Sequence, residues 1–278
     1  MEQLYSRYKQ ALQGMYTAHE ISIIFRTCVA DVLQVEEQKT YFLSDLTYTK
    51  AQIERLQDML QQLARNTPIQ YVLGYETFMG LRFSVTPDVL IPRPETAELV
   101  AQIIAQNKHR EHLRILDIGT GSGCIAIALA HYLPQASVMA VDVSKGALQV
   151  AQKNAHSIGV NIQFQELDFL QQNQQLTADF DLVVSNPPYI RNAEKADMEN
   201  NVLLHEPHTA LFVPDNDPLL FYRAIAQFAS TRPIPWVYLE INRAFGEETC
   251  QLFTKLGYKT QLQNDQFGNP RLVRAEKW

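Results

Sequence analysis

The stretch Ile115-Leu116-Asp117-Ile118-Gly119-Thr120-Gly121-Ser122-Gly123 decides the fold of this chain. Its first four residues are mostly apolar and predict a buried strand, and Cys124–Tyr132 predicts a helix directly after the glycines. Glycine adopts positive φ without a steric penalty and lets a ligand approach the backbone closely. In open α/β sheets such a turn lies at the carboxyl end of a strand, where ligands bind. The stretch therefore predicts an α/β fold with a binding site at this turn.

The spacing of the glycines indicates which ligand the turn binds. A dinucleotide fingerprint, G-x-G-x-x-G, would need glycine at position 124, where the chain has Cys124. The observed G-x-G-x-G resembles the first motif of class I S-adenosylmethionine methyltransferases. A tight turn without a ligand is the alternative, which three alternating glycines disfavour because each weakens the folded chain. We therefore expect S-adenosylmethionine as the cofactor, in contact with Gly119, Thr120, Gly121, Ser122 and Gly123.

Strands and helices alternate after Leu113, which predicts a mostly parallel sheet covered by helices on both faces. A further helix is expected at Gly146–Ile158. The last two strands are too close together for a helical crossover, so we expect an antiparallel hairpin there. Residues 89–278 are thus predicted to form a Rossmann-like domain. Its seven strands are expected at Arg114–Ile118, Ser137–Asp142, Ile162–Leu167, Phe180–Ser185, Trp236–Ile241, Lys259–Gln263 and Leu272–Ala275.

The part of the chain before this domain predicts a small helical domain at residues 1–66. Apolar residues recur there at helical spacing, for instance from Leu56 to Leu63. Thr67-Pro68 interrupts the pattern. From Ile69 to Val85 apolar residues alternate around two glycines, which predicts a β-hairpin linker over residues 67–88.

Composition narrows the class of protein and its partners. Of 278 residues 46% are hydrophobic and 19% charged, as in soluble globular proteins. The formal net charge is −6 and no run of five Lys or Arg occurs, so no direct nucleic-acid partner is expected. Cys28, Cys124 and Cys250 lack the usual zinc spacings and fit a reducing compartment. Neither a signal peptide nor a membrane-spanning run is evident. We expect a cytoplasmic monomer without membrane partners.

Acidic residues follow the second and third strands of the predicted sheet. Asp142 could accept hydrogen bonds from both ribose hydroxyls, or it could be a surface acid before Ser144. In methyltransferases similar to this chain, the position of Asp168-Phe169 lies against the adenine. We expect Asp168 to accept from the exocyclic amine and Phe169 to stack on the ring. The alternative is a loop acid followed by a core aromatic.

The chemical site is predicted at Asn186-Pro187-Pro188-Tyr189, which follows the buried strand Asp181–Ser185. An amide nitrogen is a poor nucleophile because its lone pair is delocalised. Its methylation requires two acceptors that draw its hydrogens out of the plane, and the Asn186 side-chain oxygen and the Pro187 carbonyl are suitable. The prolines hold these acceptors rigidly, and Tyr189 is expected to stack on the amide. Catalysis then rests on proximity and electrostatics. A proline loop with a buried tyrosine is the alternative.

The remaining candidates are less specific. Arg93 and Glu95 either line the active site and bind substrate or pair with each other, and Glu95 lies near the start of an expected amphipathic helix. His205 and His208 have no evident third ligand and are interpreted as surface residues. No metal site is predicted.

Taken together, these residues resemble the HemK/PrmC family, the peptide chain release factor glutamine methyltransferases. The resemblance extends over nearly the whole chain, including the helical domain and hairpin. The residues that carry it are Pro68–Gly74, Ile91–Thr96, Asp117–Gly123, Val184–Ile190, Glu206-Pro207 with Ala210-Leu211, Leu239–Ile241, and Gly268-Asn269 with Arg271.

The resemblance implies methylation of the glutamine side-chain amide in the Gly-Gly-Gln motif of peptide chain release factors. It implies cofactor contacts from Gly119 to Gly123 and from Asp142, Phe169 and Asn186, substrate contacts from Asn186 to Tyr189, and engagement of the release factor by the N-terminal domain. The chain departs from the family pattern in two places. Ala97 stands where a second Glu is usual, and Asn242–Gly246 replaces a more usual Gly and Gln-Gly pattern. These departures concern the substrate-covering segment and the sheet edge.

Three other functions remain as alternatives. A ribosomal-protein glutamine methyltransferase belongs to the same superfamily, although Arg93–Thr96 favours the release-factor branch. A DNA adenine methyltransferase shares N-P-P-Y because an exocyclic amine poses the same geometric problem, but it would need a basic target-recognition region. A cofactor-binding scaffold without chemistry would have no need of Asn186–Tyr189.

Overall fold

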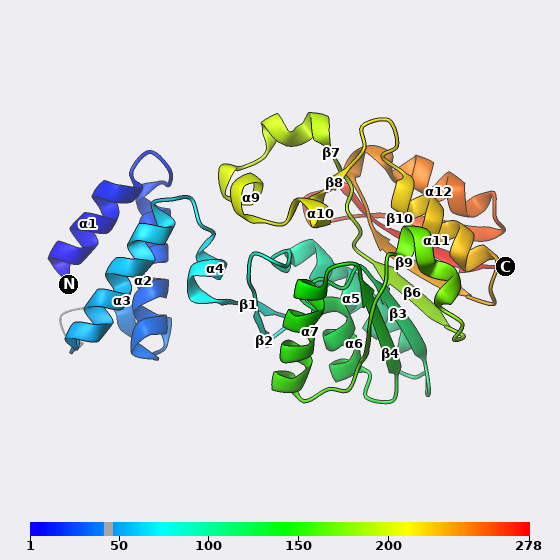
Figure 1. The fold of residues 1–278 in the computed structure, drawn as a ribbon, viewed down its shortest axis with the longest axis horizontal. Helices are drawn as coiled ribbons and strands as arrows, with labels where there is room; N and C mark the ends of the chain where they lie inside the picture. The colour runs from blue at the N-terminus through cyan, green and yellow to red at the C-terminus, as the bar shows by residue number, and fades with distance from the viewer. Residues whose placement is uncertain (42–46) are drawn as a thin grey trace. The chain divides into compact units, whose positions relative to one another are not determined.

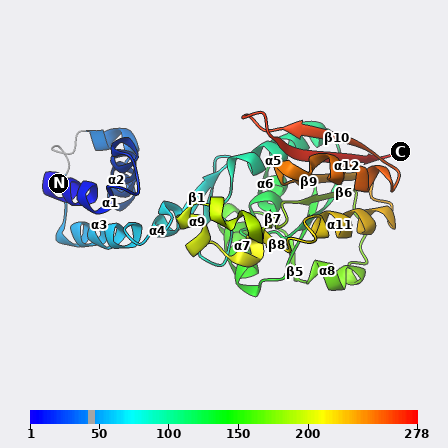
Figure 2. The ribbon, with the colours of Figure 1, turned by 90° about the horizontal axis from the view of Figure 1, so that it is seen from above.

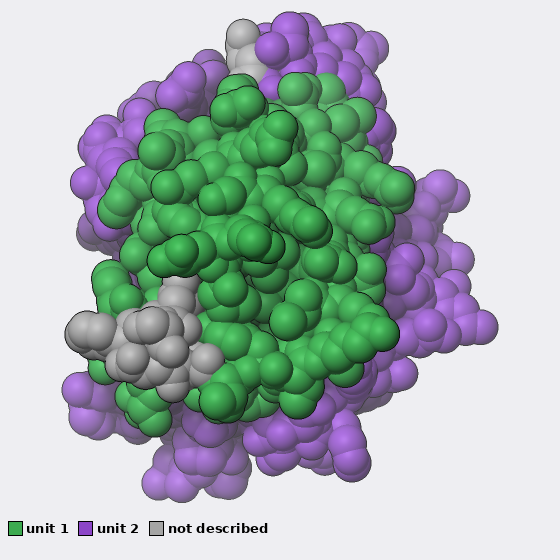
Figure 3. Space-filling model, turned by 90° about the vertical axis from the view of Figure 1, so that its left-hand side faces the viewer, with its two compact units in different colours: residues 1–74, 199–205 green, residues 75–198, 206–278 purple. Residues whose placement is uncertain are grey.

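The computed structural model describes residues 1–41 and 47–278, which divide into two compact units. Unit 1 consists of residues 1–74 and 199–205, and unit 2 of residues 75–198 and 206–278 (Figure 3). Unit 1 therefore includes a short segment that follows the predicted Asn186–Tyr189 loop in sequence. The spacing of apolar residues did not indicate this association.

Unit 1 is helical, as its apolar spacing predicts. The capping boxes of Thr17 with Glu20 and of Thr49 with Gln52 begin its two longest helices and satisfy backbone N–H groups there. The apolar faces of the first three α-helices meet in one core, where the Tyr8 hydroxyl donates to the Leu56 carbonyl at 2.6 Å. The part of the helical prediction that falls on residues 42–46 lies outside the described residues. The elements are α1 (Glu2–Leu12), α2 (Ala18–Leu33), η1 (Glu37–Tyr41), α3 (Lys50–Leu63), α4 (Ile69–Leu73) and α9 (Asn200–His205).

The predicted hairpin begins later than its apolar pattern indicated. Ile69–Leu73 forms helix α4, which Gly74 ends with φ +83°. The prediction of a strand pattern was wrong for these residues, because five residues are too few for apolar spacing to separate a helix from a strand. The hairpin itself consists of β1 (Tyr75–Phe78) and β2 (Leu81–Ser84), paired antiparallel, and it belongs to unit 2.

Unit 2 contains a sheet of seven described strands in the order β10-β11-β9-β6-β3-β4-β5. Figure 2 shows β10 and β5 on opposite sides of this unit. The pairs that join β9, β6, β3, β4 and β5 are parallel, and β11 is antiparallel to both β9 and β10. This confirms the predicted Rossmann-like fold and its terminal hairpin. The strands are β3 (Arg114–Ile118), β4 (Ser137–Asp142), β5 (Gln163–Glu166), β6 (Leu182–Ser185), β9 (Trp236–Glu240), β10 (Tyr258–Asn264) and β11 (Pro270–Lys277).

Helices cover both faces of this sheet (Figure 1). Ile115 and Leu116 point to opposite faces, as neighbouring strand residues must, and they belong to different hydrophobic cores. The Ile115 side packs against α5 (Pro94–Asn107), α6 (Cys124–Tyr132) and α7 (Lys145–Ile158). The Leu116 side packs against α8 (Phe169–Gln172), α11 (Leu220–Ser230) and α12 (Gly246–Thr254). The shorter elements are η3 (Asn173–Gln175), β7 (Ile190–Arg191), η4 (Asn192–Asp197), α10 (His208–Leu211), β8 (Phe212–Val213) and η5 (Arg243–Phe245).

The order of the strands brings the two predicted motifs together. From β3 the chain proceeds outward to β4 and β5, and then returns to β6 on the other side, so the topological switch point lies between β3 and β6. Ile118 is opposite Ser185 in the register, and the Ser185 hydroxyl donates to the Ile118 carbonyl at 2.7 Å. The glycine turn after Ile118 and the loop beginning at Asn186 therefore start side by side.

We expect Gly123→Ala to destabilise the protein by about 2 to 3 kcal/mol. Gly123 has φ +82°, and a Cβ there would lie 2.7 Å from Ile127 Cδ1 and 3.1 Å from Ala151 Cβ. The backbone strain costs about 1 kcal/mol and the overpacking about 1 to 2 kcal/mol more. Gly159→Ala is the matched control, since φ is +81° but no described atom lies within 4 Å of the added Cβ. Urea unfolding of both variants measures the difference, and equal losses would contradict the steric argument.

Candidate functional site

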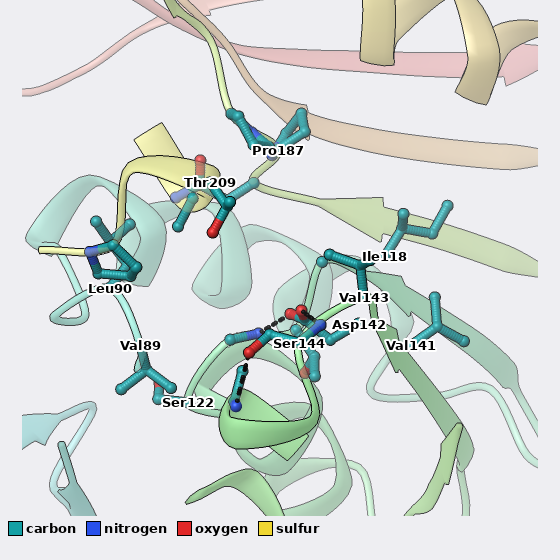
Figure 4. A pocket seen from close by; sticks show the side chains of 18 of the residues that line it. Val89, Leu90, Ile118, Ser122, Val141, Asp142, Val143, Ser144, Pro187 and Thr209 are labelled. Carbon is teal, nitrogen blue, oxygen red and sulfur yellow. Dashed lines mark hydrogen bonds between the residues drawn. The ribbon is translucent and has the colours of Figure 1, made fainter. Parts of the chain in front are cut away.

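A cavity of about 270 Å³ opens at the carboxyl edge of the sheet in unit 2. Figure 4 shows Ser122, Asp142 and Ser144 on one side of it and Pro187 and Thr209 on the other. The cavity thus lies between the glycine turn and the loop at the end of β6, where ligands bind in open α/β folds. Most of the predicted site residues line it: Arg93, Gly119, Thr120, Gly121, Ser122, Asp142, Asp168, Phe169, Asn186, Pro187 and Pro188.

The glycine turn presents open backbone to the cavity. Gly119 and Gly121 have φ of +73° and +56°, and no described atom would lie within 4 Å of a Cβ on either. Glycine is needed here for its backbone conformation, and the free space above it is available to a ligand. Gly123 does not line the cavity, and its role is close packing against α6 and α7. The Ser122 hydroxyl is buried and has no partner among the described residues.

Asp142 is oriented by two backbone donors. Its Oδ2 accepts from the Gly121 N–H at 2.9 Å and its Oδ1 from the Ser144 N–H at 2.9 Å. Burial raises the pKa of Asp142, and these backbone hydrogen bonds oppose that effect. A carboxylate oxygen accepts more than one hydrogen bond, so both oxygens retain capacity for ligand hydroxyls. Val143 follows in the cavity wall and is 58% exposed, which makes it an apolar surface that the sequence did not single out.

Asp117 lies beneath the turn and is fully buried. Its Oδ2 accepts from the Thr120 hydroxyl at 2.7 Å, while its Oδ1 has no partner in the described part of the chain. Burial raises the pKa of Asp117 to about 7. Thr120 therefore directs its hydroxyl to this carboxyl group and presents the rest of the residue to the cavity.

Asp168 and Phe169, the third predicted cofactor contact, have different surroundings. Asp168 caps α8, accepting from the Leu170 N–H at 3.0 Å, and it lines the cavity. Phe169 is 5% exposed, and its ring packs edge-on against Phe228 with centroids 5.3 Å apart. Phe169 also lines the cavity, but its side chain belongs to the hydrophobic core. Stacking on a ligand remains a prediction for this residue.

Asn186 is anchored by its amide nitrogen. Its Nδ2 donates to Thr96 Oγ1 at 3.1 Å, and the Thr96 hydroxyl donates to Glu240 Oε2 at 2.6 Å. Pro187, the next residue, is buried and also lines the cavity. The side chain of Asn186 is therefore fixed by one end, beside the glycine turn and within the cavity wall.

Tyr189 is held by core residues and by Glu240. It is not among the residues that line the cavity, and its ring packs against the core on the α11 and α12 face. Its hydroxyl donates to Glu240 Oε1 at 3.2 Å and is approached by Arg271 Nη1 at 3.4 Å. Burial raises the pKa of the Tyr189 hydroxyl. Stacking on a substrate amide finds no support in this arrangement and stays a prediction.

Thr96 and Glu240 are buried polar residues next to the site to which the sequence reasoning gave no role. Both are buried, at 2% and 1% exposure. Burial raises the pKa of Glu240, whereas the Thr96 hydrogen bond, the Arg271 charge and the Tyr189 hydrogen bond lower it. A signal was present, because Glu240 is the acid in the otherwise apolar strand β9, at the edge where ligands bind. Buried acids of this kind require partners.

Arg93 pairs with Glu206 and not with Glu95. The Arg93 guanidinium donates to Glu206, whose other oxygen accepts from the Ile91 N–H at 3.4 Å. Burial raises the pKa of Glu206, and the charge of Arg93 opposes this. The predicted alternative of an Arg93–Glu95 pair was therefore wrong. Arg93 lines the cavity, while Glu95 is in the first turn of α5 and does not.

The two departures from the family pattern, at Ala97 and at Asn242–Gly246, both lie in unit 2. Ala97 is partly buried on α5, against the core of that face. Asn242 donates to the Tyr189 carbonyl at 3.0 Å and to Glu194 at 3.2 Å, and its side-chain oxygen accepts from the Ala244 N–H at 2.9 Å. Asn242 thus supports the backbone that follows the predicted chemical site.

Residues 1–41 and 47–278 contain neither a metal-binding cluster nor a membrane-spanning helix. No group of three or more His, Cys, Asp or Glu side chains there could hold a metal ion. His205 bonds to the Arg65 carbonyl at 3.0 Å, and His208 packs edge-on against Phe212. Within the same residues, each helix is too short or too polar to span a bilayer.

Comparison with known families matches both parts of the chain. Residues 95–212 match the Methyltransferase small domain family, and residues 3–74 match the PrmC N-terminal domain family. A release factor glutamine methyltransferase of Flavobacterium psychrophilum is 46% identical over 277 residues, covering 97% of this chain and 96% of that protein. One of Bacteroides thetaiotaomicron is 40% identical over 280 residues and covers 100% of both chains. One of Streptococcus pneumoniae is 36% identical and covers 98% of this chain and 97% of that protein.

Solved structures share the fold at low sequence identity. A methyltransferase from Pyrococcus furiosus superposes with a TM-score of 0.53 at 17% identity, covering 79% of this chain and 98% of that chain. A 16S rRNA methyltransferase of T. thermophilus, in complex with AdoMet and guanosine, gives a TM-score of 0.51 at 17% identity, covering 73% and 50%. These similarities identify the fold as that of methyltransferases.

Proposed function

The chain belongs to the family of release factor glutamine methyltransferases, and we propose that it methylates the glutamine side-chain amide in the Gly-Gly-Gln motif of a peptide chain release factor. One observation carries the proposal. The Asn186 carboxamide stands at the carboxyl end of β6, beside the glycine turn, with its nitrogen engaged by Thr96. Its oxygen is therefore available to accept from a substrate amide.

S-adenosylmethionine is the cofactor of this family. When bound, it supplies a methyl group made electrophilic by the neighbouring sulfonium charge. The cavity fits such a molecule, because Gly119 and Gly121 leave open space above their backbones and Ser122 Oγ is a buried hydroxyl without a described partner. Asp142 would accept from hydroxyl groups of the ribose, and Asp168 would accept from the adenine amine.

The chain's contribution to methyl transfer is to orient and polarise the substrate amide. Asn186 Oδ1 and the Pro187 carbonyl would each accept one hydrogen of the amide NH₂. Two acceptors out of the amide plane reduce the delocalisation of the nitrogen lone pair and direct it into the cavity. Because the acceptors are fixed before the substrate arrives, little reorganisation is needed during the reaction. Methyl transfer to the neutral amide would leave a positive charge on the nitrogen, which makes its proton acidic enough to pass to water afterwards, so a strong base is not required beforehand.

Asp142→Ala is expected to weaken cofactor binding by about 10- to 100-fold. Hydrogen bonds to a charged acceptor contribute about 1.5 to 3 kcal/mol, which converts to this range of Kd. Calorimetric titration of S-adenosylmethionine measures the effect. Asp179→Ala removes an exposed acid that pairs with Arg114 far from the cavity, and serves as control. An unchanged Kd in Asp142→Ala would show that this carboxylate does not contact the cofactor.

Methyl-labelled S-adenosylmethionine tests the function directly. The protein is incubated with a release factor, with the same factor carrying Gly-Gly-Ala in place of Gly-Gly-Gln, with ribosomes and with duplex DNA. We expect label only in the first sample, and mass spectrometry of its peptides should locate one methyl group on the glutamine. Label in a ribosomal protein or in DNA would replace the proposal by one of the two alternative methyltransferase functions.

The helical N-terminal domain, residues 1–66, is proposed to engage the release factor. Its match to the PrmC N-terminal domain family supports this role. We also propose a monomeric enzyme that acts in the cytoplasm. The three cysteines, all within the described residues, are buried and free, as expected of a protein from a reducing compartment.

A further inference from the structure

We propose that Thr96 and Glu240 are positioning residues that hold the Asn186 carboxamide in the one orientation that leaves its oxygen to the substrate. The inference rests on the proposed function, because it deepens the role given to Asn186 there. Neither residue was assigned a role from the sequence. Both reach the site from elements distant in the chain, Thr96 from the first turn of α5 and Glu240 from the end of β9.

Hydrogen bonds join these residues in one buried series. Asn186 Nδ2 donates to Thr96 Oγ1 at 3.1 Å, and Thr96 Oγ1 donates to Glu240 Oε2 at 2.6 Å. Glu240 Oε1 accepts from the Tyr189 hydroxyl at 3.2 Å. Arg271 donates to that hydroxyl at 3.4 Å; burial raises the pKa of Glu240, and the charge of Arg271 opposes this effect.

Counting hydrogens assigns the direction of the series. With Glu240 ionised, as the Thr96–Glu240 hydrogen bond requires, its carboxylate has no hydrogen to give and the single hydroxyl hydrogen of Thr96 points to Glu240. Thr96 can then only accept from Asn186, and it is the NH₂ group of the carboxamide that must face it. A flip of the carboxamide would bring its oxygen against an oxygen whose hydrogen is already committed. A buried group left without a partner in this way is costly.

The same carboxylate also restrains the other end of the loop. Asn186 is connected to Glu240 through Thr96, and Tyr189 is bonded to Glu240 directly. Both ends of the Asn186–Tyr189 turn therefore depend on one side chain that is 1% exposed. This explains a buried acid in an apolar strand, which would otherwise destabilise the fold.

Side-chain NMR tests the orientation without any substrate. In ¹⁵N-labelled protein the Asn186 side-chain NH₂ signals, identified by their loss in Asn186→Ala, should exchange slowly with solvent. We expect slow exchange in the wild type and in Thr96→Ser, which keeps the hydroxyl, and fast exchange in Thr96→Val, which keeps the shape but not the hydroxyl. Unchanged exchange in Thr96→Val would overturn the inference whatever protein the enzyme methylates.

Kinetics on the release factor test the consequence. We expect Thr96→Val to lower kcat about 10- to 100-fold with little change in KM or in cofactor Kd, and Thr96→Ser to restore kcat. Thr249→Val is the matched control, since Thr249 is also buried and donates to the Phe245 carbonyl at 2.7 Å, outside the series. Equal losses of kcat in Thr96→Val and Thr249→Val would show that Thr96 only stabilises the fold, and would contradict its positioning role.

A double-mutant cycle of Thr96 and Glu240 tests the series through a second residue, in case Thr96→Val alone folds poorly. Glu240→Gln should lower kcat because a carboxamide has one acceptor oxygen for two donors. Residues that act as a unit are not additive, so Thr96→Val with Glu240→Gln should lose scarcely more than the worse single variant. Fully additive losses would contradict the series. Absence of release-factor methylation in the wild type would instead contradict the proposed function and leave the NMR test standing.

Discussion

Replacing Asn186 with alanine is expected to lower kcat for methyl transfer by about 10²- to 10³-fold. The variant removes one of two acceptors that orient the substrate amide, and loss of one preorganised polar group at a reacting atom has about this cost. After truncation the Thr96 hydroxyl still donates to Glu240, but it loses the Asn186 NH₂ group from which it accepts a hydrogen bond. The effect should fall on kcat, because the acceptor acts on the reacting nitrogen and the remainder of the release factor still binds.

The measurement is single-turnover methylation of a release factor at saturating cofactor. Thermal unfolding of the variant checks that the fold is intact, and calorimetry gives its affinity for S-adenosylmethionine. Asn186 was also expected to contact the cofactor, so a modest weakening of Kd is compatible with the prediction. If the Kd for S-adenosylmethionine rises by as much as kcat falls, the primary role of Asn186 is cofactor binding, and the proposed orientation of the substrate amide by Asn186 is wrong.

Asp117→Asn is expected to remove a pH dependence of stability worth about 4 kcal/mol. The pKa of Asp117 rises from its ordinary value near 4 to about 7 in the folded protein, because burial disfavours the charged form. The folded protein therefore holds this proton where the unfolded chain releases it. The stabilisation is fully present below about pH 4 and is lost as the pH rises through about 7, at about 1.4 kcal/mol per pH unit.

Urea unfolding of both proteins, without cofactor, measures this effect between roughly pH 5 and pH 8. The free energy of unfolding of the wild type minus that of Asp117→Asn should fall by about 3 kcal/mol across this range. Asparagine retains an oxygen for the Thr120 hydroxyl, and any fixed cost of its NH₂ group shifts the difference equally at every pH. A difference that is constant with pH would mean that Asp117 is ionised in the folded protein throughout.

Much of the fold followed from short stretches of sequence. The glycine turn, the strands and the helices between them were predicted with nearly the observed bounds, because apolar periodicity and glycine conformation are local properties. The exception was Ile69–Leu73, where one helical turn and a short strand have the same apolar pattern. Asp142 and Asn186 were placed at the cavity because parallel strands end at the same edge of the sheet.

Contacts between distant residues could not be read in this way. Arg93 pairs with Glu206 across 113 positions, although Glu95 is its neighbour in sequence. Phe169 packs largely against Phe228, so its exposure to a ligand depends on the opposite helix. Residues 199–205 belong to the helical unit 1, and nothing in their own composition indicates it.

The sequence by itself determined that this chain has a methyltransferase fold and that its glycine turn and its Asn186-Pro187-Pro188-Tyr189 loop lie at one edge of the sheet, since both are local motifs. Only the tertiary structure decided how Asn186 is turned. Its partner Thr96 lies 90 positions away, and Thr96 is in turn bonded to Glu240 across 144 positions. Hydrogen-bond direction is set by every donor and acceptor in a buried series together, so it exists only once the fold has brought them into contact.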